Sequence, residues 1–191
     1  MYQISQKIIA LLLLLMTLPL FLILYILVRM SSDGPFLYTQ KRAGKDMKPF
    51  IIYKIRTMVR NAEQIKNKYL HLNQAEGPTF KIKNDPRFTK IGRYLARAGI
   101  DELPQLLNVV NGTMTFVGPR PLPLSEAEKI PQRYKKRFSI PPGITSPWVI
   151  QGSHNIPFKT WMELDSMYVK NHTIQGDMYI ALQTVRLIIQ T

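Results

Sequence analysis

Residues 8–28 read IIALLLLLMTLPLFLILYILV and contain no charged side chain. At about 1.5 Å of rise per residue, a helix of this length reaches the ~30 Å thickness of a bilayer's hydrocarbon core. A cleaved signal peptide is the alternative, but the run is longer than a typical signal core and no small-residue cleavage site follows Val28. The sequence therefore predicts a membrane-embedded helix over residues 1–30 and a separate folded domain over residues 31–191.

Pro19 lies near the middle of the apolar run. It cannot donate a hydrogen bond to the Leu15 carbonyl, and its ring bends a helix. One interpretation is a kinked helix that spans the bilayer, with Thr17 satisfying a carbonyl that Pro19 leaves free. The other is a re-entrant helix that enters and leaves by the same face, which the positive flanks Lys7 and Arg29 favour slightly. The residues alone leave both topologies open.

Composition limits the chemistry of the domain. The chain has 191 residues, 46% of them hydrophobic, which is enough apolar material for one core. Its net charge of +14 predicts an anionic partner, such as nucleic acid, acidic lipid headgroups or a phosphate-bearing substrate. The absence of cysteine excludes disulfides and thiolate chemistry, and three His residues argue against a zinc site. Any catalysis must therefore use carboxylates, hydroxyls, Lys or Arg.

The segments after the apolar run mix strands and helices. Short aromatic and β-branched runs at 36–40 and 50–55, joined by Gly44-Lys45-Asp46, predict a β-hairpin. Most of its basic residues are expected on anionic membrane lipid: Lys41, Arg42, Lys45, Lys48, Lys54, Arg56 and Arg60. Helices are predicted over 61–73, 89–98, 159–170 and 178–189, the last either in the core or at the membrane interface.

Residues 99–112, GIDELPQLLNVVNG, predict a short helix that starts at Asp101 and stops at Asn111-Gly112. Asp101 can be an ordinary N-cap, with Glu102 as a favourable charge in the first turn. The adjacent carboxylates can instead form a Mg²⁺ and phosphate site, because hard oxygen ligands suit Mg²⁺ and free helix N–H groups attract phosphate.

Residues 116–123, FVGPRPLP, predict a stiff loop in which prolines such as Pro119 and Pro121 restrict Arg120. A guanidinium presented in this way offers two parallel donors to a phosphate. A solvent-exposed Arg in a proline-rich loop is the common alternative.

Taken in order, these segments resemble the small monotopic phosphoglycosyl transferases, the bacterial sugar transferase family. The matching motifs are KRAG (41–44), KPF (48–50), YKIRTM (53–58), DPR (85–87), DELPQL (101–106) with Asn108-Val109, VGPRP (117–121), PGIT (142–145) and Leu164-Asp165 with Tyr168-Val169. The chain departs from the family pattern at Leu18-Pro19, where the family has Ser-Pro, and at Thr113, Val149 and Ser153. The last two departures leave the identity of the sugar open.

The resemblance implies an α+β, mostly helical fold. Its parts are an N-terminal re-entrant helix broken at Pro19, a compact catalytic domain with a small β-hairpin, and interfacial amphipathic helices. The family's location further implies that the protein lies in the bacterial inner membrane, with residues 31–191 facing the cytoplasm.

The resemblance also implies a reaction. Asp101 is expected to attack a nucleotide-sugar, with a UDP-sugar the expected donor, and to pass the phosphosugar to polyprenyl (undecaprenyl) phosphate. Mg²⁺ is the expected cofactor, held by Asp101 and Glu102, and Glu102 helps with metal or proton handling. The phosphate and nucleotide contacts are expected from Lys54, Arg56, Arg87 and Arg120, with Pro119 and Pro121 beside them.

Two other classes of protein fit part of the sequence. A non-catalytic, membrane-anchored basic binding or scaffold protein would explain the charge and the anchor, but not the carboxylate pair or the constrained Arg120. Nucleic acid is not an expected partner, because no stripe interleaves aromatic and basic residues. Whether the protein forms a homodimer is left open.

Overall fold

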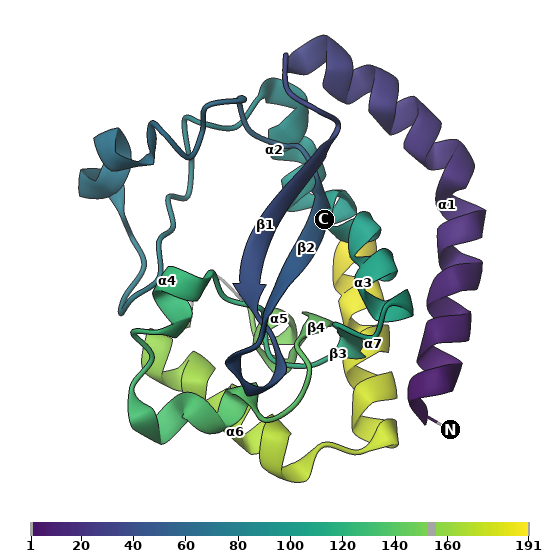
Figure 1. Cartoon of the computed structure of the whole chain (residues 1–191), viewed down its shortest axis with the longest axis vertical. Coiled ribbons are helices and arrows are strands. Elements are labelled where there is room, and N and C mark those ends of the chain that lie inside the picture. Colours follow the sequence, from purple (N-terminus) through teal and green to yellow (C-terminus); the bar gives the residue numbers. More distant parts are fainter. Residues whose placement is uncertain (1, 153–155, 191) are drawn as a thin grey trace.

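Helices predominate in the computed structural model, which describes residues 2–152 and 156–190 (Figure 1). The helices are α1 (Tyr2–Ser31), α2 (Lys90–Arg97), α3 (Leu106–Val110), α4 (Leu124–Ala127), α5 (Pro147–Ile150), α6 (Phe158–Asn171) and α7 (Ile174–Ile189). The 3₁₀ turns are η1 (Lys45–Met47), η2 (Lys66–Leu72), η3 (Ile100–Gln105) and η4 (Gln132–Phe138). The strands are β1 (Leu37–Ala43), β2 (Pro49–Ile55), β3 (Thr115–Val117) and β4 (Gly143–Thr145). The mostly helical α+β class is therefore confirmed.

Helix α1 is long and apolar enough to cross a membrane, and most of its apolar side chains are exposed. It contains Pro19 and curves along one side of the molecule (Figure 1). The Thr17 hydroxyl donates to the carbonyls of Leu13 and Leu14, at 2.9 and 3.0 Å. Those are not the Leu15 carbonyl that Pro19 leaves without its usual donor, so Thr17 does not compensate for the proline as the sequence suggested.

Both ends of α1 are attached to the rest of the fold. Near its start, the Gln6 side chain accepts a hydrogen bond from the Phe116 backbone N–H at 2.9 Å. Near its end, Val28 packs in a buried apolar cluster with Ile55 and Leu95. The helix therefore lies along the folded body over its whole length, and does not project from it.

The predicted hairpin is confirmed. Strands β1 and β2 pair antiparallel, with Tyr38 opposite Lys54 and Arg42 opposite Phe50. Side chains alternate between the faces of a strand, so Arg42 and Lys54 lie on the same face of the hairpin. Strand β2 packs against η3, which carries Asp101. The hairpin thus brings two cations from separate strands to the carboxylate pair.

A second, parallel sheet that the sequence did not predict holds the proline-rich loop. Strands β3 and β4 pair so closely that a Cβ on Gly143 would lie 2.0 Å from the Gly118 nitrogen. The Gly143 N–H donates to the Pro119 carbonyl at 3.1 Å, and the Ala43 N–H donates to the Leu122 carbonyl at 2.9 Å. The loop is therefore fixed on both sides of Arg120, by β4 and by the hairpin.

Two helix predictions have different outcomes. The predicted helix over 61–73 is wrong, because turns lead into η2, which buries no side chain and gains nothing from packing.

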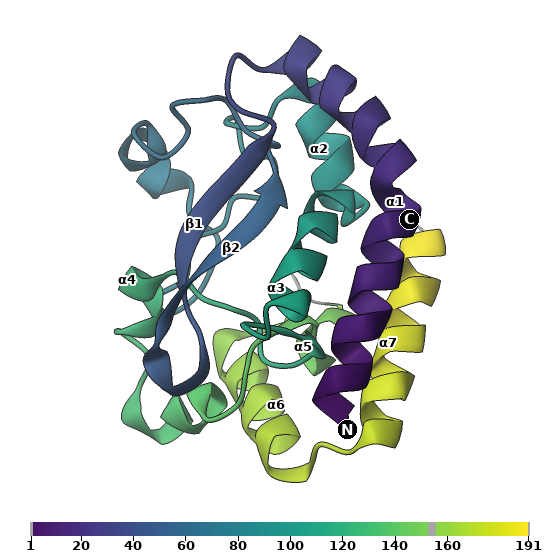
Figure 2. The same cartoon turned by 45° about the vertical axis from the view of Figure 1, so that its right-hand side comes forward.

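Helix α7 forms as predicted, but it is not a core helix, since Met178, Leu182 and Val185 are exposed. Figure 2 shows α7 beside α1, and the Tyr2 hydroxyl donates to Asp177. The two helices therefore meet near their N-terminal ends.

Candidate active site

The carboxylate pair lies on η3. The N-cap of this turn is Gly99, with φ 68°, and its first turn contains Asp101 and Glu102. Asp101 therefore does not cap the helix, and the N-cap interpretation of this residue is wrong. Asp101 is nevertheless only 6% exposed, so its carboxylate must be stabilised by other partners.

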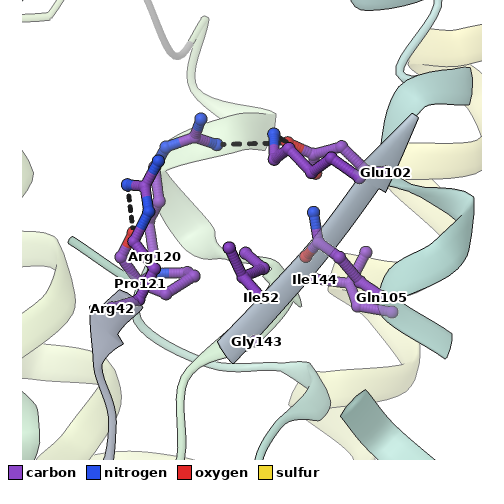
Figure 3. Close-up of a pocket in the computed structure, with 9 residues that line it drawn as sticks. Arg42, Ile52, Glu102, Gln105, Arg120, Pro121, Gly143 and Ile144 are labelled. Atoms are coloured by element: carbon purple, nitrogen blue, oxygen red, sulfur yellow. Dashed lines mark hydrogen bonds and ion pairs between the residues drawn. The ribbon is translucent and has the colours of Figure 1, made fainter. Parts of the chain in front are cut away.

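Those partners are cations from β2 and the proline-rich loop. The Lys54 Nζ lies 2.6 Å from Glu102 Oε1 and 3.5 Å from Asp101 Oδ2. Arg120 Nη1 lies 3.8 Å from the same Glu102 oxygen (Figure 3). One ammonium group is shared between two carboxylates, and one guanidinium completes the cluster at a longer distance.

A pocket opens beside this cluster, with about 230 Å³ of space that is partly open to solvent. Its walls are formed by Arg42, Ile52, Lys54, Glu102, Gln105, Arg120, Pro121, Gly143 and Ile144 (Figure 3). Three of these side chains are cations and one is a carboxylate. An anion such as a phosphate would be attracted to the pocket.

The two carboxyl groups differ in acidity. Burial raises the pKa of the Asp101 carboxyl, and the positive charges of Lys54 and Arg120 offset part of that increase. Burial also disfavours the charged form of Glu102, but Lys54 and Arg120 outweigh it and hold its pKa below the ordinary value. Asp101 is thus the more basic carboxylate, which suits a nucleophile, while Glu102 stays ionised.

Arg42 is a pocket residue that the sequence assigned to the lipid-facing basic patch. Its Nη1 donates to the Pro121 carbonyl at 3.1 Å, and its buried Nε has no hydrogen-bond partner among the described residues. Burial, together with the nearby charge of Arg120, lowers the pKa of Arg42 to about 10. The alternation of β1 was the available signal, since it separates Arg42 from Lys41 on the other face.

Arg120 is supported from behind by residues far away in the sequence. Arg137 Nη2 donates to the Arg120 carbonyl at 2.9 Å and to Asp165 Oδ2 at 2.6 Å. The Arg120 guanidinium also lies 5.2 Å from the ring centre of Trp148, which stacks on Trp161. These contacts limit the positions that the Arg120 side chain can adopt. No local motif predicted the role of Arg137.

A model of the family described as "Bacterial sugar transferase" matches residues 1–191. The chain belongs to the bacterial sugar transferase family.

Named relatives agree with this assignment. The galactosyl transferase CpsE of Streptococcus agalactiae is 41% identical over 160 residues, which cover 83% of this chain and 36% of the relative. The undecaprenyl-phosphate galactose phosphotransferase of Salmonella typhimurium is 36% identical over 174 residues, covering 88% and 37%. The exopolysaccharide production protein ExoY of Rhizobium meliloti is 33% identical over 171 residues, covering 87% and 76%. This chain therefore spans little more than a third of the first two relatives and three quarters of the third.

Four predicted site residues of this family member lie outside the pocket walls: Asp101, which borders the pocket through its contact with Lys54, and three others. Arg87 is held by its neighbour Asp85, with Nη2 at 2.6 Å from Oδ2. Arg56 Nε donates to the Pro35 carbonyl at 2.6 Å. Pro119 lines an adjoining hollow, which Arg120 and Arg137 also line. The structure thus brings together Lys54, Asp101, Glu102, Arg120 and Pro121, places Pro119 in the adjoining hollow, and pairs Arg56 and Arg87 with other partners.

The donor set suits Mg²⁺ better than zinc. Among the described residues, no group of three or more His, Cys, Asp or Glu side chains could hold a metal ion. Mg²⁺ commonly binds through one or two carboxylates together with substrate phosphates and water. The pair Asp101 and Glu102 fits that arrangement, with the phosphate oxygens supplied by the ligand.

Proposed function

We propose that this chain transfers a sugar-1-phosphate from a UDP-sugar to undecaprenyl phosphate through a covalent aspartyl intermediate. The observation that carries the proposal is the buried Asp101, held next to Glu102 by Lys54 at the edge of a cationic pocket. The names of relatives support the substrate classes. One is called an undecaprenyl-phosphate galactose phosphotransferase, and another, from Erwinia amylovora, a UDP-galactose-lipid carrier transferase.

The reaction proceeds in two displacements at one phosphorus atom. An oxygen of Asp101 attacks the phosphorus that carries the sugar, and the bond from that phosphorus to the oxygen of UMP breaks. An oxygen of undecaprenyl phosphate then attacks the same phosphorus, and the bond to Asp101 breaks. The carboxylate is regenerated and the product is undecaprenyl diphosphate sugar. A carboxylate nucleophile thereby divides one displacement between two bulky phosphates into two easier steps.

The other pocket residues stabilise charge. Arg120 and Arg42 bind the phosphate oxygens, and Lys54 keeps Asp101 ionised and oriented. When bound, Mg²⁺ would neutralise diphosphate charge, with Asp101 and Glu102 as its protein ligands. Glu102, fixed by Lys54, is available to hold a metal ion or a proton next to the reacting carboxylate.

The lipid substrate requires this site to lie near a membrane surface. We infer that α1 is re-entrant, with both ends on the cytoplasmic side of the bacterial inner membrane. Tyr2 bonds Asp177 at one end, and Ser31 lies 3.5 Å from Thr89 at the other. A helix that crossed the bilayer would separate its ends by ~30 Å of hydrocarbon, so both ends could not contact one folded domain on one side.

The reaction is tested by UMP release from a panel of UDP-sugars, with undecaprenyl phosphate and Mg²⁺ in a nanodisc. We expect Asp101→Asn to lower the rate on the order of 10³-fold or more, because the nucleophile is lost. The exposed acid Asp33 offers a matched control, and Asp33→Asn should retain wild-type activity.

The intermediate has its own measurement. Without the lipid acceptor, the intact mass of the wild type should increase by one sugar phosphate, and that of Asp101→Asn should not. An active Asp101→Asn protein would contradict the role of Asp101. A wild type that releases UMP from no UDP-sugar would contradict the proposed donor class.

The topology can be tested by cysteine labelling, since the chain contains no cysteine of its own. Single Ser5→Cys and Ser32→Cys variants mark the two ends of α1. We expect a membrane-impermeant maleimide to label both in inside-out vesicles and neither in spheroplasts. Labelling of the two positions from opposite sides would show a spanning helix instead.

A further inference from the structure

Two buried amides on consecutive turns have opposite surroundings. Asn108 is 1% exposed, and its side chain accepts from the Tyr53 N–H at 3.2 Å and donates to the Ile51 carbonyl at 2.6 Å. Gln105 is 2% exposed, yet among the described residues its side-chain amide has no hydrogen-bond partner. Asn108 joins α3 to β2, whereas Gln105 has no structural role of this kind.

The Gln105 side chain faces the pocket. Residues three apart share a face of a 3₁₀ turn, and Glu102 and Gln105 on η3 both line the pocket. Figure 3 shows Gln105 reaching into it beside Ile144, on the same side as Glu102. The Gln105 amide is not sealed inside the protein, so a ligand or water that enters the pocket can complete its hydrogen bonds.

We propose that the Gln105 amide donates a hydrogen bond from Nε2 to an oxygen of the transferring phosphoryl group. This inference rests on the proposed function. The other polar groups that face the pocket with Gln105 include Arg42, Lys54 and Arg120. Three cations around one pocket favour a phosphate group as its ligand. The neutral Gln105 amide can stabilise the transition state by donating to the phosphoryl oxygen. Because it carries no charge, it does not replace Lys54 or Arg120 as the partner of Asp101 and Glu102. Because the same phosphoryl group is present in both displacements, Gln105 serves both half-reactions.

The proposal predicts opposite effects on activity and stability. Gln105→Met has similar length, lacks the donor, and places an apolar group beside Ile52 and Ile144. We expect kcat/KM to fall about 10²-fold to 10³-fold, equally for every UDP-sugar used, as when one preorganised donor is removed. The Tm of the ligand-free variant should equal or exceed that of the wild type, because the substitution breaks no side-chain hydrogen bond of Gln105 within the described residues. The control Asn108→Leu should lower the Tm, because it leaves backbone partners in the hairpin unpaired.

The experiment combines UMP release from several UDP-sugars with the Tm of each protein, alone and with inorganic pyrophosphate. Pyrophosphate should raise the Tm of the wild type and raise that of Gln105→Met less, because a ligand that binds the native state stabilises it. Activity of Gln105→Met within about two-fold of the wild type would overturn the proposal. So would a fall in its Tm like that of Asn108→Leu. A loss that differs between sugars would assign the amide to the sugar and overturn the phosphoryl assignment.

The pyrophosphate measurement separates this inference from the reaction itself. A wild type that turns over no UDP-sugar would contradict the proposed function. In that case an equal response of the wild type and Gln105→Met to pyrophosphate would also overturn the role of Gln105, and a weaker response of the variant would support it.

Discussion

Two clusters of opposite charge meet at Arg120, and they are built differently. In the pocket, Lys54 is shared between Asp101 and Glu102, and the Arg120 side chain is 33% exposed at 3.8 Å from Glu102. Behind the pocket, the side chains of Arg137 and Asp165 are 1% and 0% exposed, and Arg137 donates twice to one carboxylate oxygen, at 2.9 and 2.6 Å. The first cluster is open to solvent. The second is closed, although Asp165 Oδ1 has no hydrogen-bond partner among the described residues.

This difference in exposure indicates that the open cluster binds the ligand and that the closed cluster supports the fold. Arg120 contributes its guanidinium to the open cluster and its backbone carbonyl to the closed one. A guanidinium with a distant partner can exchange it for a phosphate with little loss, whereas a buried pair cannot be opened without leaving an unpaired charge. We therefore expect changes in the closed cluster to affect folding, and changes in the open cluster to affect chemistry.

The largest effect is expected from breaking the closed cluster. Arg137→Met should lower the free energy of unfolding by about 3–5 kcal/mol, because Asp165 is left buried and unpaired. Denaturant unfolding in a detergent micelle measures it. The double variant Arg137→Met/Asp165→Leu should recover part of the loss, since it removes both charges. A single variant as stable as the wild type would show that the pair does not support the fold.

The next effect tests the open cluster. Arg120→Ala should lower kcat/KM for UMP release about 10²-fold to 10³-fold, because a charged donor to the phosphate is lost, and should change the Tm little. Arg120→Lys should restore only part of the activity, because an ammonium cannot donate two parallel hydrogen bonds. The exposed Arg60 offers a control in Arg60→Ala. Loss of stability in Arg120→Ala, similar to that in Arg137→Met, would erase the distinction between the clusters.

Sequence reasoning located the open cluster but not the closed one. Asp101 and Arg120 lie in short, rigid motifs whose local chemistry is visible in the sequence. The partner of Arg120, Arg137, reaches it only through the packing of η4 against α6. Arg42 was misjudged because the choice between the two faces of β1 depends on its register with β2. The contact between Arg137 and Arg120 leaves no local pattern in the sequence.

The same distinction explains the fold predictions. The hairpin and α6 were predicted because their own residues carry the turn signal or the apolar spacing. The segment 61–73 has helix-forming residues, but its η2 turn buries none of them, so propensity alone did not produce an α-helix. Strands β3 and β4 are each three residues long, too short for a period to be recognised.

The ion pair of Asp85 and Arg87 is more exposed than the closed cluster and less exposed than the open one. The side chains of Asp85 and Arg87 are 5% and 7% exposed. Burial acts to raise the pKa of Asp85, but the hydrogen bonds and charge of Arg87 outweigh it and hold that pKa below its ordinary value. Asp85→Asn should therefore lower the free energy of unfolding by about 1.5–3 kcal/mol near pH 7.

The pH dependence of that difference follows from linkage. A depressed carboxyl pKa stabilises the native state above the unfolded-state value of about 3.9, and the contribution is lost as the pH falls through the lower native value. The difference in the free energy of unfolding between the wild type and Asp85→Asn should thus be constant above pH ~5 and shrink in acid. A gap that widens in acid would show that burial, and not Arg87, dominates Asp85.

The smallest effect is expected from Lys54, the cation shared within the open cluster. Asp101 acts as a carboxylate, so activity should fall as the pH drops through its pKa, which burial raises. The Lys54 charge opposes that increase, so Lys54→Gln should raise the pKa of Asp101 further and move the acid limb of kcat/KM to higher pH. The exposed Lys48 provides the control Lys48→Gln, whose limb should coincide with that of the wild type. An acid limb unmoved in Lys54→Gln would mean that the shared ammonium serves Glu102 alone, and the open cluster would then be two separate pairs.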